Sequence, residues 1–200
     1  MASSAVDIFN LACGVLGLPP VSSISENTRQ AARLNSVWPS VRRAVLREHP
    51  WNRATTHKVL TLRSDSPTAE WDYWFNLPSD CLRVLSINND ANVSSGEHYA
   101  IEAHPSEDVT VLVSDDSTVT IEYIRDIQNA GLFDDSMAIH MANELARRVA
   151  PMFSRNPTTL SYLARVHAQD GESAKSSDGQ EGTPKQIGST WIVDARSQKV

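Results

Sequence analysis

Among the residues that could do chemistry, His49 stands out because it follows an arginine-rich stretch and precedes Pro50 and Trp51. A histidine in such a place could act as a general acid or base, or bind a metal ion. No nucleophile, acid or metal-ligand pattern lies near it in the sequence, and a residue before proline is pushed out of helical geometry. We therefore interpret His49 as the end of a helix and Trp51 as an aromatic anchor just beyond it.

Other histidines and acids offer little more. His98 and His104 flank a predicted strand, and His140 lies one helical turn from Glu144, but a metal site would need further ligands in each case. The adjacent acids at 115–116 and 134–135 point apart on a strand or helix, so they predict a turn and a helix start. No Walker A loop, GxSxG, GxGxxG, HExxH or CxxC motif occurs in the sequence. We expect no catalytic residue, metal site or cofactor, and no enzymatic activity.

Positive charge is clustered in four arginines on or just after one predicted helix: Arg42, Arg43, Arg47 and Arg53. The whole chain is acidic, with 18 lysines and arginines against 24 aspartates and glutamates and a formal charge of −6. That balance disfavours a protein that grips phosphates over its whole surface. We favour a solvated or salt-bridged helix face, and a small nucleic-acid-binding module that uses Arg42, Arg43 and Arg47 is an alternative.

The composition is that of a globular protein. The 200 residues, 40% hydrophobic and 21% charged, suffice for one domain or for two small subdomains that share a core. No apolar run reaches the roughly 18 to 20 residues of a membrane span, and the first residues lack a basic and apolar leader, so we expect no membrane association. Cys13 and Cys81 lie far apart, which indicates two buried thiols in a reducing cytosol.

Two segments near the N-terminus have the apolar spacing of helices. The first covers 5–16 and ends at Gly17, which can take the left-handed cap conformation before two prolines. The second is predicted to start at Ser25 as its N-cap and to end at His49, with Pro39 expected to kink or split it.

Helical spacing returns in the last third of the chain. A third helix is predicted from Asp135 or Ser136, with a buried stripe of residues three and four apart: Met137, Met141, Leu145, Val149 and Met152. Asn156 and Pro157 predict the start of a fourth helix. Beyond Asp170 the sequence leaves open a frayed helix end or an extended tail.

Between these helices the period changes to that of strands. Six short segments rich in β-branched and aromatic residues are separated by turn residues, at 58–63, 71–77, 81–88, 98–103, 110–113 and 118–124. In the last one, Val119, Ile121 and Tyr123 alternate with polar neighbours, including Glu122. We expect an α+β fold: an antiparallel-type four-helix bundle with a small antiparallel β subdomain inserted between helices 2 and 3, and an extended C-terminal tail.

The expected organisation has four parts. Residues 1–56 supply the first two helices, 57–130 the β-rich insert, 131–178 the last two helices and 179–200 the tail. The tail is polar except for Trp191-Ile192-Val193, which either folds back on the chain's own core or binds a partner. Five tryptophans exceed what a four-helix core of this size needs, so we expect some of them at interfaces.

Several segments together resemble a known family, the tail tubular protein A or head-to-tail adaptor family of short-tailed bacteriophages. They are AVDIFNLACGVLGLPPVSSISE, NSVWPSVRRAVLREHPWNRAT, WFNLPSDCLRVLSI, VTIEYIRDIQNAGLFDDSMAIHMANELARRVA and SYLARVHAQDGESAKSSDGQEG, followed by WIVDAR at 191–196. The resemblance lies in the order and spacing of these segments, which together cover nearly the whole chain.

This resemblance implies a structural virion protein. Members of that family form a ring of twelve copies below the portal, extend the DNA channel, and carry the tail nozzle and fibres. The implied partners are therefore other copies of this chain, the portal protein, the nozzle protein with tail fibres, and double-stranded DNA that passes without sequence-specific binding. The implied location is the virion tail at the portal vertex, and the host cytoplasm during assembly.

The resemblance also implies roles for particular residues. Family members reach the portal through their C-terminal segment, so we assign portal binding to Gly188, Trp191, Ile192, Val193 and Arg196. The remaining candidates are ring or core anchors: Trp38, Trp51 and Phe133. Besides the nucleic-acid-binding module, the alternatives are a connector or head-completion protein of a long-tailed phage and an enzyme that acts on the cell wall.

Overall fold

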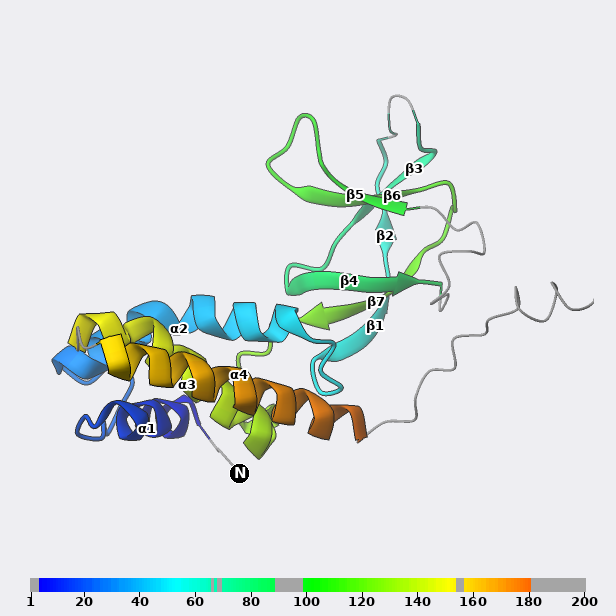
Figure 1. Cartoon of the computed structure of the whole chain (residues 1–200). Coiled ribbons are helices and arrows are strands. Elements are labelled where there is room, and N and C mark those ends of the chain that lie inside the picture. Colours follow the sequence, from blue (N-terminus) through cyan, green and yellow to red (C-terminus); the bar gives the residue numbers. More distant parts are fainter. Residues whose placement is uncertain (1–3, 66, 68–69, 89–98, 154–156, 181–200) are drawn as a thin grey trace, which may run out of the picture. The chain divides into compact units, whose positions relative to one another are not determined.

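The computed structural model of the chain describes residues 4–65, 67, 70–88, 99–153 and 157–180 (Figure 1). Its helices are α1 (Ala5–Leu16), α2 (Arg29–Glu48), α3 (Asp135–Phe153) and α4 (Pro157–Gln180), with a short 3-10 helix, η2 (Ala130–Leu132). Its strands are β1 (Thr55–Val59), β2 (Thr61–Leu62), β3 (Tyr73–Asn76), β4 (Cys81–Ile87), β5 (Tyr99–Ala103), β6 (Thr110–Ser114) and β7 (Thr120–Arg125). None of the helices in this described part combines the length and apolar character needed to cross a bilayer.

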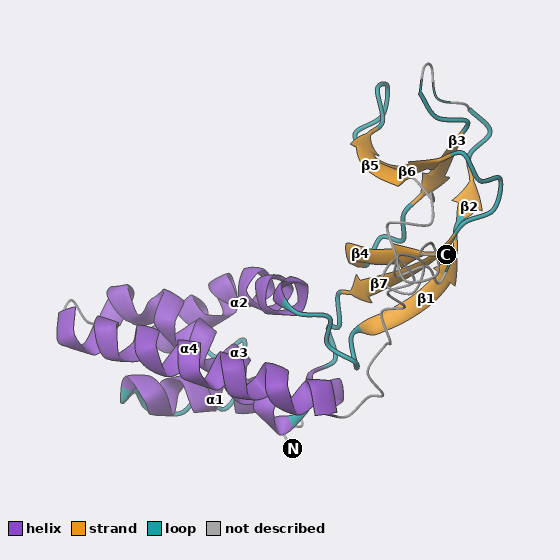
Figure 2. Cartoon of the chain, turned by 45° about the vertical axis from the view of Figure 1, so that its right-hand side comes forward, coloured by secondary structure: helices purple, strands orange, loops and turns teal. Residues whose placement is uncertain are grey.

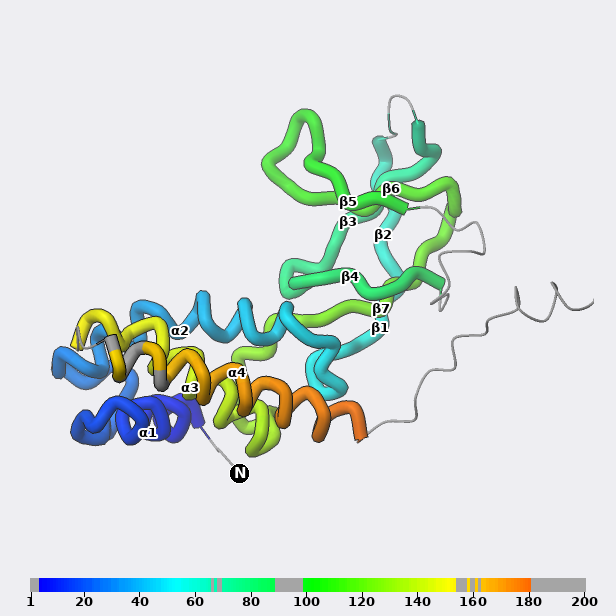
Figure 3. The backbone as a smooth tube through the Cα atoms, in the orientation of Figure 1, coloured from blue at the N-terminus to red at the C-terminus, as the bar shows by residue number. Residues whose placement is uncertain are grey.

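The chain divides into two compact units. Within the described residues, the helical unit lies in Met1–Thr55 and Ile124–Gly182, and the β-rich unit lies in Thr56–Tyr123. The chain trace in Figure 3 leaves the helical unit after α2, passes through all seven described strands, and returns at the end of β7 to α3 and α4. Each unit has its own buried core.

In the helical unit, α3 is the central helix and contacts α1, α2 and α4. Its buried stripe explains this position, because Met137, Met141, Leu145 and Val149 are all fully buried. The stripe ends earlier than the sequence predicts: Met152 is 41% exposed. Pro151 lies inside the last turn of α3, two residues before the helix ends.

Local capping chemistry sets the ends of α1. The Ser4 side chain accepts a hydrogen bond from the backbone N–H of Asp7 at the start. At the other end Gly17 has φ 66°, and the backbone N–H of Leu18 donates back to the carbonyl of Cys13. The predicted left-handed glycine cap is confirmed.

The start of α2 differs from the prediction, whereas its end agrees. Thr28, and not Ser25, is the N-cap and accepts from the N–H of Ala31. The reason is that Glu26 bends back to bind the Ser22 N–H and hydroxyl, which makes a separate turn before the helix. Pro39 does not split the helix, which runs without interruption to Glu48, and His49 is extended as predicted.

The last two helices begin where the sequence predicts, and only the cap of α3 differs. α3 is capped by Asp134, whose carboxylate accepts from the N–H of Met137, and not by Asp135 or Ser136. α4 begins at Pro157 as predicted and remains helical to Gln180, which removes the alternative of an extended tail just beyond Asp170.

The strands form two antiparallel sheets, so the expected four-helix bundle with a small β insert is wrong (Figure 2). One sheet has the order β1-β7-β4 and the other β2-β3-β6-β5, seven strands in the described residues. The predicted strand at 58–63 is in fact two strands divided at Leu60, whose N–H donates to the carbonyl of Val119. Because the chain passes from one sheet to the other at this residue, a second sheet can form.

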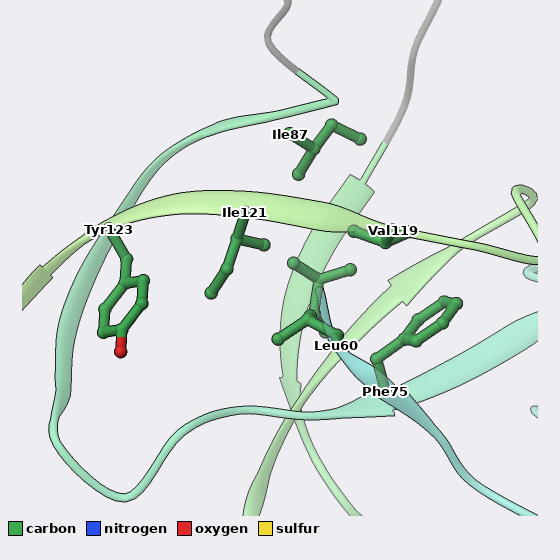
Figure 4. Packing of buried hydrophobic residues seen from close by; sticks show 7 residues of the cluster. Leu60, Phe75, Ile87, Val119, Ile121 and Tyr123 are labelled. Atoms are coloured by element: carbon green, nitrogen blue, oxygen red, sulfur yellow. The ribbon is translucent and has the colours of Figure 1, made fainter. Parts of the chain in front are cut away.

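Residues from both sheets make the main core of the β-rich unit: Leu60, Phe75, Ile87, Leu112, Val119, Ile121 and Tyr123 (Figure 4). The other face of the four-stranded sheet carries a second, smaller cluster of Trp74, Val111 and Val113. Glu122 departs from the predicted alternation, because it is buried and accepts from the hydroxyl of Ser86. A carboxylate can be buried on that strand because a hydrogen-bond donor meets it there.

Candidate functional site

The three predicted ring or core anchors lie in the interior of the helical unit. Trp51 is fully buried, Phe133 is 1% exposed and Trp38 is 6% exposed. Trp51 donates its indole N–H to the carbonyl of Val45, and Trp38 packs edge-on against Phe9. In one copy of the chain these side chains act as core residues, and none offers appreciable surface to a neighbour.

The predicted portal-binding residues lie outside the described residues: Gly188, Trp191, Ile192, Val193 and Arg196. His98, one of the weaker metal candidates, also lies outside them.

His49 has a structural role next to Trp51. Its Nε2 lies 3.2 Å from a carboxylate oxygen of Asp178 on α4, and its ring packs edge-on against Trp51. Asp178 is only 3% exposed and also accepts from the backbone N–H of Asn52. The loop after α2 is thereby joined to the last turn of α4.

The arginine cluster is divided by the fold. Arg42 is buried and makes two parallel hydrogen bonds of 2.8 Å to Asp126. It is therefore not available to a phosphate, which counts against the nucleic-acid-binding module that used it. Arg43 and Arg47 remain exposed on α2, together with two arginines that the sequence reading did not group with them, Arg29 and Arg33.

A cluster of ionisable residues lies where α4 meets α2 and α3. We call it the histidine cluster; its ionisable members are Glu48, His140, Glu144, His167 and Lys175, and Gly171 packs among them. The rings of His140 and His167 are stacked almost parallel, with centroids 4.7 Å apart. Glu48 binds Lys175, and Glu144 binds Arg147 and Arg148, with His167 Nε2 at 3.3 Å.

His140 is the unusual member of this cluster. Its side chain is 1% exposed, yet neither ring nitrogen has a hydrogen-bond partner, and Glu48 is the nearest acid at 3.6 Å. Most buried polar groups are hydrogen-bonded, so an unpartnered imidazole needs an explanation. Gly171 makes the close packing possible, because a Cβ at that position would lie 2.8 Å from His140 Cε1.

Burial and charge shift the ionisation of this cluster. Burial lowers the pKa of His140, a positive charge on His167 lowers it further, and the charge of Glu48 only partly offsets this. Burial would raise the pKa of Glu48 and of Glu144, but their basic partners outweigh it and hold both below the usual range. At neutral pH the cluster therefore contains two carboxylates and a neutral His140.

The sequence reading identified only one part of the histidine cluster, the pair His140 and Glu144. The missed residues follow a helical spacing on the buried side of α4: His167, Gly171, Lys175 and Asp178. A helix that packs on a bundle normally has apolar residues on its buried side. Polar residues at that spacing were therefore the one feature of the sequence that could have indicated this cluster. The cluster borders an open cavity of about 510 Å³. No group of three or more potential ligands among the described residues is arranged to hold a metal ion.

A second hollow lies between α1 and α3. It measures about 480 Å³ and is lined by Asp7, Asn10, Leu11, Asp135, Ala138 and Ile139. Leu11 is 43% exposed and Ile139 is 45% exposed. We call it the α1/α3 groove, an apolar surface with an acid on each helix.

The β-rich unit has its own histidine, His104, in a fully bonded network. His104 Nδ1 accepts from the backbone N–H groups of Ser106 and Glu107, so its Nε2 carries the proton and donates to Asp65 at 2.9 Å. Arg63 binds Asp65 through two nitrogens, and with the His104 contact it lowers the pKa of that carboxyl to about 2. The network holds the loop after β5 in place.

Neither a scan against protein-family models nor a search of the curated proteins finds a match for this chain. The resemblance to phage adaptors therefore remains a prediction from the quoted segments.

Proposed function

We propose that this chain is a structural subunit of a bacteriophage tail, an adaptor that forms a ring between the portal and the tail nozzle. The observation that carries the proposal is the order and spacing of the adaptor-like segments, which run from Ala5 to Arg196. In this role the ring extends the DNA channel, helps to retain the genome after packaging, and releases it at infection. The protein would assemble in the host cytoplasm and remain in the virion.

The places where those segments fall in the fold support the proposal. Four of them cover a junction between elements, at the Gly17 cap, at the His49 turn, between β3 and β4, and at the Asp134 cap. Junction residues determine how successive elements meet. A resemblance at junctions is therefore stronger support for a shared fold than a resemblance on helix surfaces.

The helical unit offers two different surfaces, as a ring requires. Each subunit in a ring meets its neighbours through two unlike faces. One surface is the α1/α3 groove, apolar with Asp7 and Asp135 beside it. The other is the arginine face of α2, defined by four exposed residues on one side of the helix: Arg29, Arg33, Arg43 and Arg47. We assign the ring contact to these complementary surfaces on adjacent copies.

The charge distribution also suits a conduit for DNA. The β-rich segment 56–123 contains three lysines and arginines against twelve aspartates and glutamates, a formal charge of −9. The helical segments 1–55 and 124–182 contain twelve against eleven, a charge of +1. Clustered cations would hold passing phosphates, whereas an acidic surface leaves the duplex free to slide. We assign the nozzle side of the adaptor to the β-rich unit.

The test is electron microscopy of this protein mixed with the portal protein of its own phage. We expect a symmetric ring below the portal. A variant that lacks residues 188–200 should keep its fold and lose portal binding, whereas a control that lacks only 197–200 keeps the assigned residues and should bind. If the full chain forms no ring on the portal, the proposal is wrong. If the 188–200 deletion still binds, only the assignment of the tail is wrong.

A further inference from the structure

His140 is held in a place that suits only its neutral form. Four groups face it from neighbouring elements: Glu48 from α2, His167 and Lys175 from α4, and Trp51 from the loop after α2. An added proton on Nε2 would face one carboxylate oxygen of Glu48 at 3.6 Å, beyond hydrogen-bond distance, while the other oxygen of Glu48 binds Lys175. A buried charge that is only partly compensated is destabilising.

The remaining charged groups near His140 do not supply that compensation. Glu144, on the same helix, is occupied by Arg147, Arg148 and His167. Arg165 and Glu172 line the adjacent cavity and carry opposite charges. The proton therefore enters most readily when the packing around His140 opens.

The C-terminal half of α4 is the part of the unit that can open at least cost. The N-terminal half of α4 buries the large apolar side chain of Leu163. From His167 onward, the described part of the helix buries a single apolar side chain, that of Ala174. The other contacts of this half are polar and pair Lys175 with Glu48, His167 with Glu144, Asp170 with Asn143, and Asp178 with His49 and Asn52. A segment with few apolar contacts has low local stability.

We propose that His140 is a proton-binding site whose occupation releases the C-terminal half of α4, residues 167–180, from α2 and α3. The released form exposes His140 to water and removes the stacked pair. The observations that carry this are the orphaned ring nitrogens, the stack on His167, the occupied acids, and the tight fit against Gly171. The inference concerns the helical unit alone and does not depend on the proposed function.

The direction of the pH effect follows from linkage. The pKa of His140 is lowered in the docked state, so the released state binds the proton more tightly. Docking is therefore fully stable above the ordinary histidine pKa of about 6.5 and weakens as the pH falls below it. The docking equilibrium changes about tenfold for each unit by which the docked pKa lies below the free value.

The test compares amide hydrogen exchange of the full chain near pH 7.5 and near pH 5.5, corrected for the intrinsic exchange rate. We expect protection of 167–180 to fall by up to about tenfold, the limit that one group with a free pKa of about 6.5 can give over this pH range, while that of β6 and β7 stays constant. In His140→Phe, which keeps a flat ring and cannot take the proton, the acid-induced loss should disappear. His57→Phe is the matched control, because His57 is 54% exposed, and it should respond as the unaltered chain does.

His140→Phe could change the packing of the helical unit, so the protonation of His140 is also measured directly in the unaltered chain. Titration of the His140 Cε1–H signal by nuclear magnetic resonance in the unaltered chain should report protonation at the pH where α4 loses protection. Three results would overturn the proposal: no change in 167–180 over this pH range, an identical acid response in His140→Phe, or simultaneous loss of protection in both units.

Discussion

Each unit of this protein buries a histidine against a tryptophan, and the two pairs differ in one respect. His104 packs edge-on against Trp74 with ring centroids 4.5 Å apart, and His140 lies 6.2 Å from Trp51. Their side chains are 4% and 1% exposed, so the depth of burial is nearly the same. His104 uses both ring nitrogens in hydrogen bonds, whereas His140 uses neither.

The difference indicates what makes a buried histidine responsive to pH. In the β-rich unit, two backbone N–H groups fix the tautomer of His104, and Asp65 holds the other nitrogen. In the helical unit, the acids near His140 are bound to other cations. The supply of hydrogen-bond partners, and not the degree of burial, separates a structural histidine from a proton-binding one.

The largest difference between the units should appear when each histidine is removed. His104→Ala should destabilise the β-rich unit by about 2–4 kcal/mol, because it leaves a cavity and orphans the N–H groups of Ser106 and Glu107. His140→Ala should cost the helical unit about 1–2 kcal/mol, since it removes packing but no hydrogen bond. Hydrogen exchange of the most protected amides in β6 and α3 measures each unit separately. Equal costs would mean that hydrogen bonding does not distinguish the two sites.

A smaller effect is expected from crowding the histidine cluster. Gly171→Ala places a methyl group 2.8 Å from His140 Cε1 and should destabilise the helical unit by about 1–3 kcal/mol. Gly14→Ala is the matched control, because Gly14 is exposed in α1 with no atom within 4 Å of an added Cβ, and it should stabilise by about 0.5–1 kcal/mol. Thermal unfolding of both variants provides the measurement.

The cause of that cost can be isolated with a double variant. If the added methyl group acts through His140, then Gly171→Ala should cost much less in a His140→Ala background. An unchanged cost there would place the strain in the α4 backbone.

The acid response of the β-rich unit should contrast with that of the helical unit. The pKa of Asp65 is lowered to about 2, first by its hydrogen bonds from Arg63 and then by His104. A lowered carboxyl pKa gives stability that is present above about pH 3.9 and is lost as the pH falls toward about 2, well below the range in which His140 responds. Arg63→Gln should move the titration of the Asp65 carboxyl carbon up toward its ordinary range, and Lys58→Gln should leave it unchanged. An Asp65 titration at its ordinary value in the unaltered chain would contradict the network.

The sequence predicted the features that depend on neighbours along the chain. The Gly17 cap, the helix end before Pro50 and the helix start at Pro157 each follow from the backbone preferences of one or two residues. Thr28 was missed as a cap because Ser25 is an equally good candidate until Glu26 is seen to bind Ser22.

Features that depend on distant residues were not predictable. The division of the strands into two sheets depends on Leu60, which pairs with Val119 from the far end of the β-rich segment. The histidine cluster likewise joins Glu48, His140 and Lys175 from three helices. Spacing within a helix shows which residues share a face, but it does not show which face of another helix they meet. For this reason the only signal for Lys175 was the polar stripe on α4, and Glu48, at the end of α2, had none.

The smallest effect on stability, and the most informative about assembly, concerns one exposed isoleucine in each unit. Ile139 on α3 and Ile101 on β5 are both 45% exposed, so replacing either with serine should change stability by no more than about 0.5 kcal/mol. Ile139 lies in the α1/α3 groove that we assign to the ring contact, whereas Ile101 ends a cross-strand row at the sheet edge opposite Leu112. Ile139→Ser should therefore weaken ring formation, and Ile101→Ser should not, when both are compared by sedimentation and electron microscopy. If both variants form rings equally well, the α1/α3 groove is not part of the ring contact, because loss of the isoleucine in the groove would then have no more effect on assembly than loss of an equally exposed isoleucine outside it.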